Sequence, residues 1–193
     1  PMTAAPLAST FGAPTIGVDF GTTNTVVSLT HGDDNARLVR FSIDNRDLFA
    51  FRSALSFHSV QGQNGAVNER VVEAGPWAIE SYLEDPLETR FIQSFKTFAA
   101  SQAFTETRIL NKRYLFEDLL AAFLLRLKEH AAPQLDALPP RIIVGRPVTF
   151  AGSSPNETLA LTRYEEAFKR LGFSDIRYAY EPVAAAFFFA RQL

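Results

Sequence analysis

The chain has 193 residues, of which 47% are hydrophobic and 18 are Phe, and its formal net charge is −2 at pH 7. This size and composition predict one large or two small domains with a substantial core, while the slight acidity argues against a nucleic-acid partner. The absence of Cys excludes disulfides and thiolate zinc sites, and three widely separated His argue against a histidine metal site.

Residues 1–14 are small and proline-containing, and they lack the basic and long apolar segments of a signal peptide. We therefore expect them to form a flexible tail. No stretch approaches the ~20 apolar residues that span a bilayer, so the sequence predicts a cytoplasmic protein without a membrane partner.

The most informative segment is 15–31, TIGVDFGTTNTVVSLTH. The apolar runs 16–20 and 26–29 contain β-branched residues that favour strands, and the small and hydroxyl residues between them favour a hairpin turn. Asp19 interrupts the first apolar run, where an unpaired carboxylate would be costly to bury. We interpret it as facing a cation, because Mg²⁺ takes one or two carboxylates together with phosphate oxygens.

The turn formed by Gly21, Thr22, Thr23 and Asn24 is the candidate phosphate-binding site. Glycine lacks a Cβ and lets a ligand approach the backbone, so successive N–H groups of Gly21, Thr22 and Thr23 could surround an anion. The two Thr hydroxyls can donate further hydrogen bonds to a phosphate. The alternative is an ordinary polar hairpin in which Asp19 only caps the turn.

Alternating and helical patterns place the remaining elements along the chain. We expect one or two strands within 49–60, a strand or connector at 104–110, and strands at 36–41, 67–74, 141–145 and 176–180. We expect helices at 75–83 and 114–130, from Ser153 or Ser154 to Gly172, and at 182–193; Phe91, Phe95 and Phe98 also recur at helical spacing.

The order of these elements is three antiparallel strands, an insertion, and then helix, strand, helix, strand, helix. Such an order predicts an α/β fold in which helices cover a mixed sheet. The core subdomain would comprise residues 15–44 and 113–193, and residues 45–112 would form an inserted α+β subdomain.

Five segments together resemble one family. They are GVDFGTTNT at 17–25, VVEAGPWAIESYLEDP at 71–86, RFIQSFKTF at 90–98, IIVGRPVTF at 142–150 and YEPVAAAFFFA at 180–190. The chain resembles DnaK-type heat-shock chaperones of the actin-like ATPase superfamily, and the Gly–Arg–Pro and Ser–Phe–Lys contexts are similar to the YegD-like branch. The resemblance implies a ribonuclease-H-like lobe with a five-stranded mixed sheet that binds ATP and Mg²⁺.

The resemblance also implies roles for individual residues. Asp19 would hold Mg²⁺ through water, and Thr22 and Thr23 would contact the β- and γ-phosphates. Lys96 would stabilise negative charge on the transferred phosphoryl group, and Glu181 would lie near Mg²⁺ and the attacking water. The alternatives are a solvated Lys96 on an amphipathic helix and a Glu181 that only stabilises a helix N-terminus.

Arg146 and Pro147 match the segment that relays the nucleotide state to partners in this family, although Arg146 departs from the usual motif. The family's second phosphate loop, Asp–Gly–Gly, and its adenosine pocket have no match here. We therefore expect the N-terminal lobe of a longer ATPase, which by itself binds ATP weakly or not at all and is inactive. Partners would be unfolded client proteins or co-chaperones, and Phe187, Phe188 and Phe189 would favour self-association.

Three other functions are compatible with these residues. A filament-forming actin-like protein shares the Gly–Thr–x–Asn loop and the Glu–Pro–x–Ala–Ala–Ala stretch, but it lacks a lysine at the Lys96 position. A sugar or carboxylate kinase of the same superfamily would need a further carboxylate base, for which the sequence offers no convincing candidate. A pseudo-ATPase would use the same fold as an interaction module.

Overall fold

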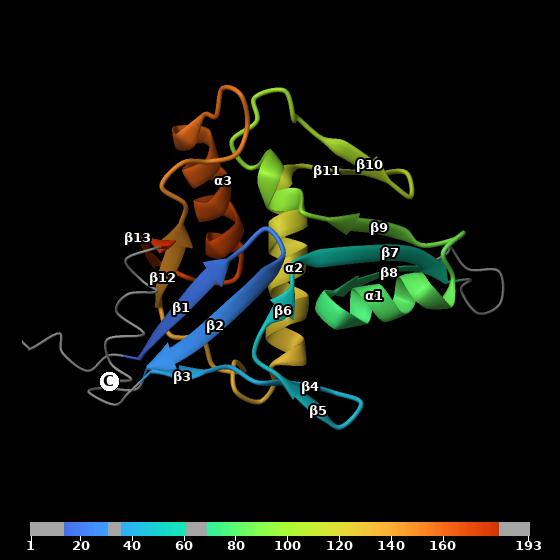
Figure 1. Ribbon diagram of the computed structural model, residues 1–193, viewed down its shortest axis with the longest axis horizontal. Helices are drawn as coiled ribbons and strands as arrows, with labels where there is room; N and C mark the ends of the chain where they lie inside the picture. Colours follow the sequence, from blue (N-terminus) through green and yellow to red (C-terminus); the bar gives the residue numbers. More distant parts are fainter. Residues whose placement is uncertain (1–13, 31–35, 61–68, 182–193) are drawn as a thin grey trace, which may run out of the picture.

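The computed structural model describes residues 14–30, 36–60 and 69–181 (Figure 1). Within these residues the largest sheet has the strand order β13-β12-β1-β2-β3, and β6 also pairs with β2. Strands β13, β12 and β1 run parallel, whereas β1, β2 and β3 run antiparallel. The strands are β1 (Thr15–Phe20), β2 (Asn24–Thr30), β3 (Arg37–Leu38), β6 (Phe51–Arg52), β12 (Arg141–Arg146) and β13 (Asp175–Tyr180). The predicted α/β class with a mixed sheet is confirmed, and β6 joins the five-strand path as a sixth strand.

The register of the parallel strands brings their carboxyl ends to one edge of the sheet. Val18 of β1 lies opposite Val144 of β12, and Gly145 lies opposite Ala179 of β13. Successive side chains of a strand point to opposite faces. The next residues along, Asp19 and Gly145, therefore lie opposite each other on one face of the sheet. The residues that follow them, Phe20 and Arg146, point to the other face.

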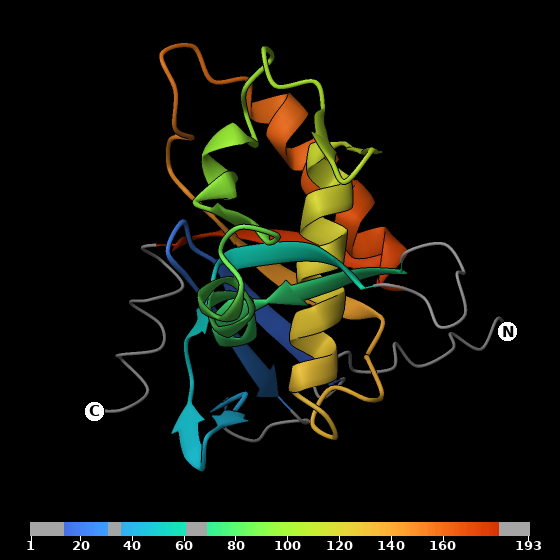
Figure 2. The same cartoon turned by 90° about the vertical axis from the view of Figure 1, so that its right-hand side faces the viewer.

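Two helices, α2 (Phe116–His130) and α3 (Glu157–Arg170), pack against each other and against the sheet (Figures 1 and 2). The apolar period predicted for 114–130 is confirmed, because its residues at i, i+3 and i+4 spacing are buried. The prediction that Ser153 or Ser154 caps α3 is wrong. Asn156 is the cap, and its Oδ1 accepts a hydrogen bond from the Leu159 N–H at 2.9 Å.

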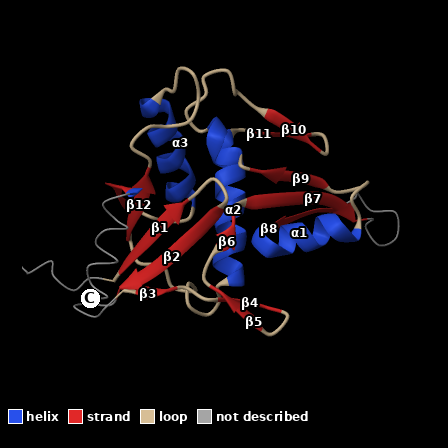
Figure 3. Cartoon of the chain, viewed as in Figure 1, coloured by secondary structure: helices blue, strands red, loops and turns tan. Residues whose placement is uncertain are grey.

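The insertion has its own three-stranded antiparallel sheet, in the order β8-β7-β9, together with helix α1 (Figure 3). The helical spacing of Phe91, Phe95 and Phe98 does not correspond to one helix, since Phe91 lies in a strand and the other two lie in a short 3-10 helix, η2. The elements between β3 and α2, other than β6, are β4 (Phe41–Ile43), β5 (Arg46–Leu48), β7 (Ala54–Val60), β8 (Glu69–Ala74), α1 (Gly75–Glu84), β9 (Arg90–Gln93), η2 (Phe95–Phe98), β10 (Thr107–Ile109) and β11 (Lys112–Tyr114).

One aromatic core joins the sheet to the insertion. The ring of Phe20 in β1 lies 5.4 Å from that of Phe95 in η2 and 5.8 Å from that of Phe123 in α2. Phe51 of β6 contacts Phe123 as well, at 5.6 Å between ring centroids. All four rings are fully buried. The core therefore holds η2, and Lys96 within it, against the end of β1.

Residues 1–13, 31–35, 61–68 and 182–193 lie outside the described part of the chain. Most of the predicted tail, the predicted last helix and the side chains of Phe187, Phe188 and Phe189 belong to these segments. In the ranges that are described, no helix has the length and apolar character needed to cross a membrane.

Candidate functional site

The turn between β1 and β2 is closed by its own backbone. The Gly21 N–H donates to the Asn24 carbonyl oxygen at 3.0 Å. A Cβ on Gly21 would lie only 2.3 Å from that oxygen, so only glycine fits this position. This finding corrects one expectation, because the Gly21 N–H is used inside the turn and is not left for an anion.

The tip of the turn is open to a ligand. Thr22, Thr23 and Asn24 are exposed, although Asn24 already belongs to β2. Among the residues that the structure describes, the backbone N–H groups of Thr22 and Thr23 have no hydrogen-bond acceptor. These two N–H groups and the two Thr hydroxyls are the donors available to a phosphate.

Asp19 and Glu181 flank Gly145 at the edge of the sheet. A Cβ on Gly145 would lie 3.5 Å from Asp19 Oδ1 and 3.4 Å from Glu181 Cγ. Much of Asp19 is exposed, yet partial burial of its carboxyl group raises its pKa, the nearby Glu181 raises it further, and Lys96 lowers it. Asp19 thus lies close enough to Glu181 for the two carboxylates to repel each other.

Lys96 reaches this place from the insertion. Its side chain is 9% exposed, its Nζ lies 2.6 Å from Glu181 Oε1, and the Nζ is 5.8 Å from the centroid of the Phe20 ring. The alternative of a solvated lysine on an amphipathic helix is therefore wrong. Tertiary packing buries Lys96 and leaves Glu181 as its partner, because an unpaired ammonium would be costly there.

Two residues that sequence reasoning missed hold the turn and the Lys96 segment in place. Ser53 Oγ donates to the Gly21 carbonyl oxygen at 2.7 Å, although the two residues are 32 positions apart. Arg163 of α3 donates to four backbone carbonyls that follow Lys96, those of Phe98, Ala99, Ser101 and Phe104, at 2.5 to 3.1 Å. Neither residue lies in a motif; the only signal was for Ser53, a polar residue within an otherwise apolar and buried segment.

Arg146 lies apart from the cluster of Asp19, Lys96 and Glu181. It follows Gly145 and therefore points to the opposite face of the sheet. Its Nη2 lies 2.5 Å from Glu157 Oε1 at the start of α3, and its guanidinium stands 5.0 Å from the Tyr180 ring. Arg146 thus connects β12, β13 and α3, and Pro147 follows it as a half-buried residue.

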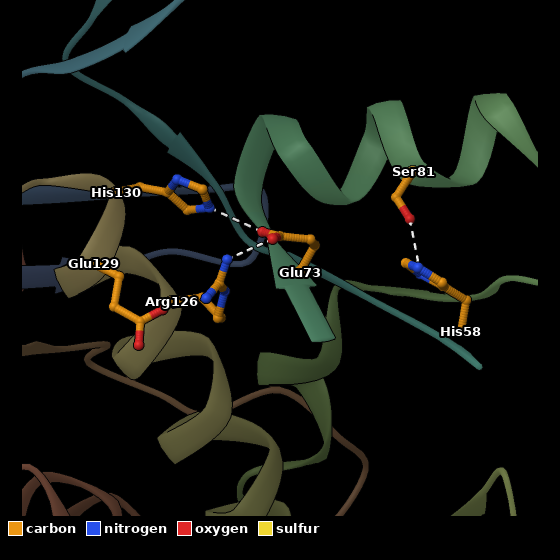
Figure 4. A network of polar contacts seen from close by, with 6 residues as sticks. All are labelled: His58, Glu73, Ser81, Arg126, Glu129 and His130. Atoms are coloured by element: carbon orange, nitrogen blue, oxygen red, sulfur yellow. Dashed lines mark hydrogen bonds and ion pairs between the residues drawn. The ribbon is translucent and has the colours of Figure 1, made fainter. Parts of the chain in front are cut away.

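A second polar cluster joins β8 to α2 and is shown in Figure 4. Glu73 Oε2 lies 2.8 Å from His130 Nε2, and Glu73 Oε1 accepts a hydrogen bond from Arg126. The His130 ring stacks on Trp77 with centroids 3.6 Å apart. Burial works to raise the pKa of Glu73, but hydrogen bonds from His130 and Arg126 outweigh it and bring the pKa below its usual value. This cluster secures α2 to the insertion and includes none of the candidate site residues.

The oxygen donors at the sheet edge suit a hard cation such as Mg²⁺. In the described segments no group of three or more His, Cys, Asp or Glu side chains is arranged to hold a metal by itself. Mg²⁺ takes one or two carboxylates and completes its shell with water and phosphate oxygens, so Asp19 could hold such an ion without further protein ligands.

No protein-family model matches the chain. The fold and the site define a mixed α/β protein in which a glycine turn, two carboxylates and a buried lysine converge at the carboxyl ends of parallel strands.

Proposed function

We propose that the chain is the phosphate-binding lobe of an ATPase similar to DnaK-type chaperones of the actin-like ATPase superfamily. The observation that carries this proposal is the convergence of Asp19, Glu181 and Lys96 beside the exposed turn. Ligands of α/β sheets commonly bind at the carboxyl ends of the strands. Residues from β1, the end of β13 and the insertion would meet there around one triphosphate.

Each residue has a distinct task in the proposed reaction. Free N–H groups and hydroxyls of Thr22 and Thr23 would bind the phosphates, and Asp19 would hold Mg²⁺ through water. Bound Mg²⁺ would offset the negative charge of the phosphates. The Lys96 ammonium would exchange its contact with Glu181 for a phosphate oxygen, where it stabilises the charge that develops during transfer.

Glu181 would then be free to act on water. Its carboxylate accepts a hydrogen bond from Lys96, and once that donor turns to the phosphate, the carboxylate can orient the attacking water and accept its proton. The exchange would make the Glu181 carboxylate available to water only when a nucleotide is bound.

The position of Lys96 favours a chaperone-type ATPase over a filament-forming relative, because the resemblance gives the filament proteins no lysine there. The buried ion pair also argues against a surface role for this residue. Filament formation by the full-length protein, seen as light scattering that rises on addition of ATP, would favour the actin-like alternative. Transfer of phosphate to a sugar or carboxylate would favour the kinase.

The proposal can be tested by titrating the ¹⁵N-labelled chain with Mg²⁺–ATP and following its amide resonances. We expect weak binding with shifts concentrated at Thr22 and Thr23. Asp19→Asn and Lys96→Met should weaken it at least about tenfold, since each removes a charged interaction with the ligand. Lys112→Met, which removes an exposed lysine elsewhere in the insertion, is the matched control.

Absence of shifts in the turn at millimolar Mg²⁺–ATP would overturn the proposal. So would equal affinities for wild type, Asp19→Asn and Lys96→Met.

A further inference from the structure

Ser53 lies between β6 and β7 and contacts two residues of the turn, Gly21 and Thr23, together with Thr25 of β2. Its N–H donates to the Thr23 carbonyl oxygen at 2.8 Å, and its Oγ lies 2.7 Å from the Gly21 carbonyl oxygen. The same Oγ lies 2.9 Å from Thr25 Oγ1. Ser53 is 2% exposed and Thr25 is fully buried, so water does not compete for these bonds.

The direction of these hydrogen bonds follows from the number of protons. A serine hydroxyl has one proton, and the Gly21 carbonyl can only accept, so the Ser53 proton goes to Gly21. The contact between the two hydroxyls must then use the proton of Thr25. Thr25, Ser53 and Gly21 form a directed chain that ends on the backbone of the turn.

This chain sets the orientation of the peptide group between Gly21 and Thr22. A trans peptide is planar, with its C=O and N–H pointing in opposite directions. Because the Gly21 C=O points at Ser53, the Thr22 N–H points away from Ser53, toward the open side of the turn. That N–H is one of the donors that the described structure leaves without an acceptor.

Strand β7, which begins directly after Ser53, also positions the segment that carries Lys96. Ala54, the residue after Ser53, lies opposite Gln93 of β9 in the β7–β9 pairing. Only Ser94 separates β9 from η2, which carries Lys96. The junction at Ser53 and Ala54 therefore ties the turn and the Lys96 segment to one strand.

We propose that Ser53 is a positioning residue for phosphate binding, which holds the Thr22 N–H toward a nucleoside triphosphate and keeps the turn in register with Lys96. This inference rests on the proposed function. Ser53 itself does not touch the ligand and acts through the Gly21–Thr22 peptide.

The test compares Ser53→Ala with Ser56→Ala. Ser56 is also fully buried and lies in β7, three residues after Ser53, but its Oγ has no hydrogen-bond partner among the described residues. Both variants remove one buried hydroxyl, and only Ser53→Ala removes a hydrogen bond to the turn, the one to the Gly21 carbonyl oxygen. The first readout is ¹⁵N relaxation of Thr22 and Thr23 without ligand, and the second is the affinity for Mg²⁺–ATP.

We expect Ser53→Ala to increase the mobility of both amides and to weaken Mg²⁺–ATP binding by about three- to tenfold, because a mobile turn must be ordered on binding. Thr25→Val should have a smaller effect, because the Ser53 hydroxyl keeps its hydrogen bond to the Gly21 carbonyl oxygen, and the double variant should add little to Ser53→Ala. Ser56→Ala should resemble wild type in both readouts.

The inference is overturned if Ser53→Ala binds Mg²⁺–ATP as tightly as wild type while Asp19→Asn and Lys96→Met bind more weakly, and the proposed function survives that result. It is also overturned if Ser53→Ala and Ser56→Ala lose affinity equally, since a general loss of stability would then explain both. Failure of the wild type to bind would overturn the proposed function together with the inference.

Discussion

Replacing Lys96 by Met removes the ammonium from the pair with Glu181 and keeps most of the aliphatic side chain. Lys96 is 9% exposed and the Glu181 side chain 29% exposed, with Nζ and Oε1 2.6 Å apart. Breaking a pair of this kind leaves one charge buried without a partner, which costs about 3 kcal/mol. Glu181 would also remain beside Asp19 with no cation between them. We therefore expect Lys96→Met to lower the free energy of unfolding by about 3 kcal/mol and Tm by roughly 6–12 °C.

The chain contains a matched control for this experiment. Lys169 Nζ and Glu165 Oε1 are also 2.6 Å apart, but both side chains are about half exposed. Water solvates the separated charges of such a pair, so its loss costs little. Lys169→Met should leave the unfolding curve within error of that of wild type.

Urea unfolding followed by the fluorescence of Trp77, the single Trp of the chain, measures both effects. Glu181→Gln and the double variant complete a mutant cycle, and we expect a coupling between Lys96 and Glu181 of at least about 1 kcal/mol. The reasoning is refuted if Lys96→Met costs no more than Lys169→Met. It is equally refuted if the two substitutions are additive to within about 0.5 kcal/mol.

Three further predictions concern other positions. Gly75 has φ +64°, and an added Cβ would lie 2.4 Å from the buried Phe51 ring, so Gly75→Ala should lower the free energy of unfolding in urea by about 2–4 kcal/mol. Gly172→Ala, also at positive φ but with open space around it, should cost less, and equal costs would contradict the steric explanation. Gly145→Ala should bind Mg²⁺–ATP like wild type, because its Cβ makes ordinary contacts, whereas Gly145→Leu should abolish amide shifts in the turn; binding by the Leu variant would show that the ligand lies elsewhere. Glu73→Gln should be less stable than wild type near pH 7, and the difference should shrink as the pH falls through the lowered pKa of Glu73; a difference that is independent of pH in thermal melts would contradict the assigned hydrogen bonds.

Local patterns were sufficient for much of the fold. The apolar period of α2 and the apolar runs of β1, β2 and β12 are properties of neighbouring residues, and the structure confirms each of them. The turn was predicted for the same reason, since a glycine followed by hydroxyl residues favours a turn in any context. Sequence patterns failed where tertiary contacts decide the local structure. In η2, Ser94 adopts the αL conformation and Phe95 is buried, so the chain forms a short 3-10 helix and not a regular α-helix.

No sequence pattern could predict the hydrogen bonds between residues that are far apart in the chain. Ser53 meets Gly21 across 32 positions, and Arg163 meets the segment after Lys96 across about 60. Neither contact depends on a periodicity, so the sequence could not indicate which serine or arginine would take part. The burial of Lys96 and its pairing with Glu181 belong to the same category.

By itself, the sequence determined the hairpin with its glycine turn and the described strands and helices of the α/β layer, and it supplied the hypothesis of which residues bind phosphate and a hard cation. Periodic burial and turn chemistry act over a few residues, which is why these features can be recognised without coordinates. Only the tertiary structure decided that Lys96 is buried and paired with Glu181 beside Asp19 and that Ser53 holds the turn next to them. The reason is physical: the free energy of a buried charge or hydroxyl depends on which distant group becomes its partner, and packing of the whole chain selects that partner.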